Sequence, residues 1–100
     1  MHYAITYDIS DDRLRNRVSK TLARNGCWRL QKSVFLAPGF NPEEISRLRV
    51  ELIGILAAKR MPSDSLLCLP IEHDLLTDNY WIPADKPADL LTRKVYKMLF

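Results

Sequence analysis

The stretch from residue 2 to residue 24 most constrains the fold, because a strand pattern passes directly into a helix pattern there. Residues 2–7, H-Y-A-I-T-Y, are aromatic or β-branched in most positions and contain no Gly or Pro, which is typical of a strand. Helical spacing then appears in Leu14, Val18, Thr21 and Leu22. Asp8 therefore stands where a strand ends and a helix follows. We expect Ser10 to be the N-cap, with the acids at 11 and 12 in the first turn.

Basic residues follow one flank of this predicted helix. At about 100° per residue, the side chains that gather beside the apolar face are Arg13, Arg17, Lys20 and Arg24. Arg15 falls on the opposite flank. A carboxylate at a strand end with a basic row beside it indicates a site where a metal ion and a polyanion meet. The alternative is that Asp8 is a turn residue and the basic row a solvated helix edge.

The next elements can be placed from their boundary signals. Asn25-Gly26 is a helix stop. Residues 27–37 alternate as extended structure, either as one long strand or as two short strands broken near Lys32. Asn41-Pro42, with Glu44 at N3, predicts a capped helix that ends near Arg60. Residues 65–71 then form a short apolar run suited to a strand.

The order strand, helix, one or two strands, helix, strand predicts an α+β fold, a ferredoxin-like βαββαβ sandwich. Both helices should cover one face of an antiparallel sheet. The other face then needs a cover, and a second copy of the chain would provide it. We assign residues 1–72 to this core domain and 73–100 to a C-terminal extension for dimer or partner contact. Within the extension we expect a short strand or an aromatic arm at 79–83 and an amphipathic helix at 87–100.

Composition narrows the class of protein. One hundred residues make one domain, and the formal net charge of +3 permits a nucleic-acid partner without requiring one. Cys27 and Cys68 form no CxxC or Cys/His cluster, so neither a zinc site nor a disulfide framework is indicated. No apolar run approaches the roughly 18 residues of a membrane span, and no leader precedes the first strand. We therefore expect a cytoplasmic protein with no membrane contact. His2 and His73 lack any partner spacing and are expected at the surface.

Two motifs carry a resemblance to a known family. Residues 7–18 read Y-D-I-S-D-D-R-L-R-N-R-V, and residues 29–35 read R-L-Q-K-S-V-F. Together they resemble the CRISPR-associated protein two family over about residues 1–71. That family has a ferredoxin-like fold and is a small homodimer. It is regarded as a metal-dependent endonuclease, and it works with the CRISPR integrase subunit during spacer acquisition.

The resemblance implies roles for individual residues. Asp8 would be catalytic and would hold Mg²⁺ at the dimer axis together with its copy. Ser33 matches a residue that flanks the site, and we predict that it is also catalytic, by orienting a water or a phosphate. The residues that would contact nucleic acid are Tyr7, Arg15, Arg17, Arg29 and Phe35, and the basic flank of the helix adds Arg13. For Phe35, packing in the core or an interface is favoured over stacking on a base, and Tyr7 is expected to be a packed ring whose hydroxyl finds a partner. The extension from Asp85 onward does not match the family pattern.

Three functions are compatible with these residues. The first is a Mg²⁺-dependent endonuclease built on a pair of Asp8 carboxylates, since Mg²⁺ prefers carboxylate oxygens and retains several waters. The second is a non-catalytic, DNA-binding dimeric scaffold for the integrase. The third is a ferredoxin-like module for a small ligand or RNA, which ranks last because the strands lack an RNP-type aromatic pattern. The sequence does not distinguish RNA, single-stranded DNA and duplex DNA as the substrate.

Overall fold

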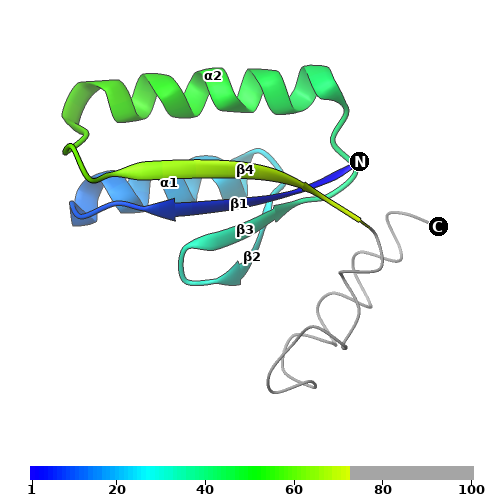
Figure 1. Ribbon diagram of the computed structural model, residues 1–100, viewed down its shortest axis with the longest axis horizontal. Coiled ribbons are helices and arrows are strands. Elements are labelled where there is room, and N and C mark those ends of the chain that lie inside the picture. Colours follow the sequence, from blue (N-terminus) through cyan, green and yellow to red (C-terminus); the bar gives the residue numbers. More distant parts are fainter. Residues whose placement is uncertain (73–100) are drawn as a thin grey trace.

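A computed structural model describes residues 1–72 of the chain. The elements are β1 (His2–Asp8), α1 (Asp12–Arg24), β2 (Trp28–Gln31), β3 (Val34–Ala37), α2 (Pro42–Lys59) and β4 (Ser65–Ile71). The four strands form one sheet in the order β2-β3-β1-β4, and every neighbouring pair is antiparallel. Figure 1 shows β1 running between β3 and β4, with α2 along the sheet. The ferredoxin-like order predicted for residues 1–72 is confirmed, whereas the strand and helix predicted after residue 73 lie outside the described residues.

Both helices pack on the same face of the sheet. The core joins Val18 and Leu22 of α1 and Leu52 of α2 to Ile5 of β1 and Phe35 of β3. Ile5, Val18 and Leu22 have no exposed surface. Burying such a side chain contributes roughly 1.5–3 kcal/mol to the free energy of folding, so these core residues contribute substantially to the stability of the fold. No helix within residues 1–72 is long and apolar enough to cross a membrane.

The segment from 27 to 37 resolves into two strands joined by a tight turn. β2 and β3 pair antiparallel through Trp28 opposite Leu36, and their ladder shifts register between Arg29 and Gln31. Lys32 and Ser33 form the turn between them. Of the two arrangements open from sequence, the structure has two short strands.

The second helix begins as its sequence signal predicts. The Asn41 side chain accepts from the Glu44 backbone N–H at 2.8 Å, and the Glu44 carboxylate accepts from the Asn41 backbone N–H at 3.1 Å. Pro42 occupies the first turn, where a missing N–H costs nothing. The helix ends at Lys59, with Arg60 as the C-cap.

Two expectations near the N-terminus are wrong. Asp11, not Ser10, is the N-cap of α1, and its carboxylate accepts from the Leu14 N–H at 2.8 Å. Ser10 is instead bound to a residue from a distant loop, as described below. His2 is buried, at 7% exposure, and its Nδ1 accepts from the Gly39 N–H at 2.9 Å. A sequence shows local caps, but it does not show the partners that tertiary folding brings in.

The face of the sheet opposite the helices carries apolar side chains. In β4 the side chains alternate, so Leu66 and Cys68 pack against the core while Leu67 and Leu69 do not. Leu67 is 52% exposed and Leu69 is 43% exposed. Within residues 1–72, neither helix covers these leucines. We call Leu67 and Leu69 the β4 apolar pair.

Candidate functional site

Asp8 is the last residue of the central strand β1, at the end of the sheet from which the chain continues into α1. Its backbone lies opposite Ser65, the first residue of β4. On the other side, the Tyr7 N–H donates to the Ser33 carbonyl at 3.1 Å, which places the β2–β3 turn beside the end of β1. Asp8 and Ser33, the two predicted catalytic residues, therefore come from adjacent segments at the same end of the sheet.

The Asp8 carboxylate is available for a ligand. The residue is exposed, and within residues 1–72 its side chain has no hydrogen bond and no ion pair. The described residues also contain no group of three His, Cys, Asp or Glu side chains that could hold a metal ion. One carboxylate leaves most of the coordination sphere of Mg²⁺ to water, and a second copy would add a second carboxylate. Residues of this kind fit Mg²⁺, which is bound through one or two carboxylates with several waters retained.

The two aromatic residues of the predicted site lie in the core. Tyr7 is 5% exposed and Phe35 is 2% exposed. Their ring centroids are 6.2 Å apart, and the Tyr7 hydroxyl donates to the Lys32 carbonyl at 3.4 Å. Neither ring offers a face to a nucleic-acid base in this arrangement. Their burial agrees with the packing role that the sequence favoured over base stacking.

The Arg29 guanidinium packs on the Phe35 ring of this aromatic pair. The Arg29 Cζ lies 5.1 Å from the centre of the Phe35 ring, which is a cation–π distance. The residue itself is exposed, so its N–H groups remain accessible to an anion. The rings of Tyr7 and Phe35 thus connect the end of β1 to the positive charge of Arg29 at the surface of β2.

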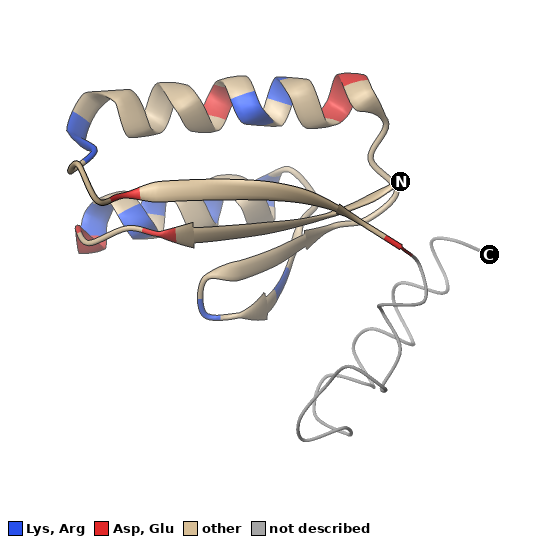
Figure 2. Cartoon of the chain, in the orientation of Figure 1, with Lys and Arg blue, Asp and Glu red and all other residues tan. Residues whose placement is uncertain are grey.

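The predicted basic residues of α1 divide into two groups. Arg13 and Arg17 are exposed and, within residues 1–72, form no ion pair, and the same holds for Lys20. Figure 2 shows that Lys and Arg recur along this helix. Arg15, by contrast, donates to the Ile9 carbonyl at 3.0 Å and pairs with Asp12, and only 27% of its side chain is exposed. The structure therefore places Arg15 as an anchor of the β1–α1 loop.

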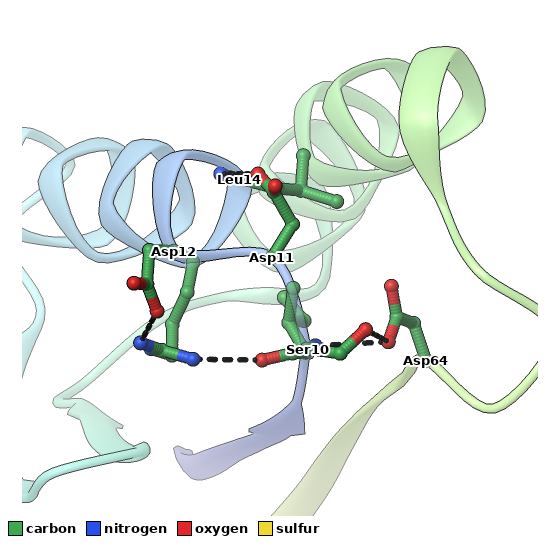
Figure 3. Close-up of polar contacts among 7 residues, drawn as sticks. Ser10, Asp11, Asp12, Leu14 and Asp64 are labelled. Atoms are coloured by element: carbon green, nitrogen blue, oxygen red, sulfur yellow. Dashed lines mark hydrogen bonds and ion pairs between the residues drawn. The ribbon is translucent and has the colours of Figure 1, made fainter.

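Sequence reasoning missed Asp64. It is 4% exposed and precedes Ser65, the strand partner of Asp8. One oxygen of its carboxylate accepts from the backbone N–H and the hydroxyl of Ser10, each at 3.0 Å, and the other accepts from the Met61 N–H at 3.0 Å. Figure 3 shows Asp64 directed at Ser10 from the opposite loop.

The ionisation of Asp64 follows from these contacts. The Met61 and Ser10 backbone donors hold the pKa of the Asp64 carboxyl below its ordinary value, against the effect of burial. The Pro62-Ser63-Asp64 run did signal a turn, but nothing in the sequence indicates a partner 54 positions away.

The comparisons with known proteins address the same region. The sequence model of the family described as CRISPR associated protein Cas2 matches residues 1–77. This chain belongs to the Cas2 family. A curated relative, the CRISPR-associated endoribonuclease Cas2 of Korarchaeum cryptofilum, is 37% identical over 73 residues, which cover 71% of this chain and 73% of the relative.

The fold of the Cas2 family is also seen in a solved structure. The crystal structure of Streptococcus pyogenes Cas2 at pH 6.5 matches with a TM-score of 0.61 at 22% identity. The match covers 75% of this chain and 90% of that one. At this level of identity the likeness concerns the fold. The family resemblance predicted from the two motifs is confirmed.

Proposed function

We propose that this chain is a Mg²⁺-dependent endonuclease that acts as a symmetric homodimer and works with the CRISPR integrase in spacer acquisition. The observation that carries the proposal is the Asp8 carboxylate at the end of β1, which is exposed and has no side-chain partner among residues 1–72. Membership of the Cas2 family and the endoribonuclease name of its relative support phosphodiester cleavage. They favour RNA as the first substrate to test.

The residues of the site suit this chemistry. Two Asp8 carboxylates at a dimer axis would hold the metal. When bound, Mg²⁺ supplies charge relief to the phosphate and acidifies a water. Arg29 would bind a phosphate oxygen close to the site, since its guanidinium is fixed on Phe35 but still exposed. Ser33, half-exposed in the turn beside Tyr7, would orient a water or a phosphate oxygen by its hydroxyl.

The dimer is supported by the β4 apolar pair. Leu67 and Leu69 lie on the sheet face that the helices leave open, and a second copy packed there would bury both. A two-fold axis through this face would also bring symmetric residues of two chains together. Asp8 needs such a partner, because one carboxylate per chain makes a sparse metal site.

The decisive experiment compares the parent with Asp8→Asn, which removes the charge and keeps the shape. Labelled single-stranded RNA and duplex DNA are incubated with Mg²⁺ or with a chelator. Glu43→Gln, at the start of α2, is the matched acidic control, since the ion pair that Glu43 forms within the described part of the chain is a loose surface contact of 3.8 Å with Arg47. We expect Asp8→Asn to lose at least about a hundredfold in rate while remaining dimeric, the scale of removing a metal or proton-transfer function.

Two results would overturn the proposed nuclease function. One is cleavage that continues in chelator, and the other is equal cleavage by Asp8→Asn and Glu43→Gln. Either result would leave a binding role as the better description of the site, with Asp8 as a turn residue.

A second function is a non-catalytic DNA-binding scaffold for the integrase. It is favoured by Arg13 and Arg17 on α1, which are exposed and form no ion pair with any other described residue. Each phosphate contact contributes about 0.9 to the slope of log affinity against log salt concentration. We expect the double substitution Arg13→Ala/Arg17→Ala to reduce that slope by about 2 per chain for duplex DNA. The measurement is a salt titration of binding by fluorescence anisotropy.

The controls separate the scaffold from the nuclease. Arg47→Ala removes an exposed arginine from α2 and should leave the slope unchanged. Asp8→Asn should bind duplex DNA as well as the parent does. An unchanged slope in the double variant would exclude α1 as the DNA-binding surface.

A further inference from the structure

The carboxylate of Asp64 joins the two loops that flank the end of β1. It receives three hydrogen bonds, two from Ser10 in the β1–α1 loop and one from Met61 in its own α2–β4 loop. The Arg60 guanidinium further ties this second loop by donating to the Asp64 carbonyl at 3.2 Å. The side chain is buried, so these bonds are shielded from competing water.

Three consecutive residues after Asp8 are each held by a separate contact. The Ile9 carbonyl accepts from Arg15, Ser10 donates twice to Asp64, and Asp11 caps α1. Asp8 itself is held by its backbone pairing with Ser65, the residue that follows Asp64. Asp64 is therefore next in sequence to the β4 partner of Asp8 and bound to the loop that leaves Asp8. The Ser10 and Asp64 contacts can be followed in Figure 3.

We propose that Asp64 is a positioning residue that ties the loop after Asp8 to the start of β4, where Ser65 pairs with Asp8, and so sets the direction of the Asp8 carboxylate toward a bound Mg²⁺. This inference rests on the proposed metal-binding function. Groups behind a metal ligand commonly change metal affinity by about 10–100-fold when they are removed. Asp64 would act in that way through the backbone, without touching the metal.

An isosteric substitution tests the proposal at the level of single atoms. In Asp64→Asn one side-chain position becomes an NH₂ donor, which cannot accept a hydrogen bond from the Ser10 or the Met61 N–H. The hydrogen bonds of Asp64 to either Ser10 or Met61 are thereby lost, while the side-chain volume stays the same. Ser10→Ala is the milder variant, because it removes only the hydroxyl bond and keeps the Ser10 N–H donor.

Glu51→Gln is the matched control. Glu51 also makes polar contacts to a distant element, with Arg24 at 2.7 Å and Asn25 at 3.1 Å, but these lie at the other end of α1. A variant that acts only through general weakening of the fold should resemble this control.

The measurement is Mn²⁺ binding to the dimeric protein by calorimetry, followed by the Mg²⁺ concentration that gives half-maximal cleavage. We expect Asp64→Asn to raise both values about tenfold or more, with the maximal rate recovered at high Mg²⁺. Ser10→Ala should change them in the same direction by less, and Glu51→Gln should leave them unchanged. Amide hydrogen exchange at Ser10 should accelerate in Asp64→Asn.

The outcomes separate this inference from the function on which it depends. One outcome is that Asp8→Asn abolishes Mn²⁺ binding while Asp64→Asn and Ser10→Ala bind Mn²⁺ as the parent does. In that case Asp64 only stabilises the two loops, and the inference is overturned. The same holds if Glu51→Gln weakens binding equally. If the parent and Asp8→Asn bind Mn²⁺ alike, the metal site itself fails and the inference fails with it.

Discussion

Arg15 and Arg17 lie two positions apart on α1, yet their guanidinium groups have different surroundings. Arg15 is directed to Ile9 and Asp12 of its own loop, whereas Arg17 remains exposed and without an ion pair among residues 1–72. Arg24 is likewise engaged, by Glu51 at 2.7 Å. The charge that α1 offers to a polyanion is thus smaller than its count of basic residues suggests. Arg13, Arg17 and Lys20 are the members left for phosphate contacts.

The burial of Cys27 gives a prediction about the reactivity of a single side chain. Burial raises the pKa of its thiol to about 12, with a further increase from Cys68. Only the thiolate reacts with alkylating reagents, so its reactive fraction at pH 8 is about a thousandfold below that of an ordinary cysteine. We expect iodoacetamide to leave Cys27 unmodified in the native protein and to modify it in urea, as measured by peptide mass spectrometry. Equal labelling in both states would contradict its burial.

At the scale of elements, the helices and strands between residues 2 and 71 largely follow from local patterns. The α2 capping box and the β4 run could be placed from sequence because all their signals lie within a few residues. The Ser10 and His2 expectations were wrong for the opposite reason, since Asp64 and Gly39 reach them from distant parts of the chain. In the candidate site, the packing of Tyr7 and Phe35 could be expected from sequence, whereas the hydrogen bonds of Asp64 could not, because its partner Ser10 lies 54 positions away.

The α2 cap yields a stability prediction. Asn41→Ala removes the side-chain acceptor for the Glu44 N–H and one half of the reciprocal pair. We expect the free energy of unfolding to fall by about 1 kcal/mol, in urea titrations at a fixed protein concentration. Arg47→Ala, an exposed change on the same helix, should stay within about 0.5 kcal/mol of the parent. A cap that contributes nothing would give the two variants the same midpoint.

For the whole molecule, the sheet has one face covered by helices and one that carries the β4 apolar pair. Leu67→Lys would place a charge in the interface that we propose for the dimer. Because burying a leucine contributes roughly 1.5–3 kcal/mol, the dissociation constant should rise about tenfold or more per affected contact. Sedimentation velocity over a range of protein concentrations measures this change.

The control for the dimer is Val50→Lys on α2, where the parent valine is 70% exposed. This substitution adds the same charge away from the open face of the sheet, and it should leave the dissociation constant unchanged. Dimers of equal strength in Leu67→Lys and the parent would place the interface elsewhere.

The order of strands in the sheet also bears on how the protein is made. β1 is synthesised first, but its neighbours β3 and β4 end at residues 37 and 71. Translation runs from the N-terminus, so the strand that carries Asp8 leaves the ribosome with neither neighbour present. It gains its second neighbour only after the whole of the described fold has been synthesised. A nascent or truncated chain that stops before β4 therefore lacks Ser65, the strand partner of Asp8, and the Asp8 end of its sheet stays incomplete.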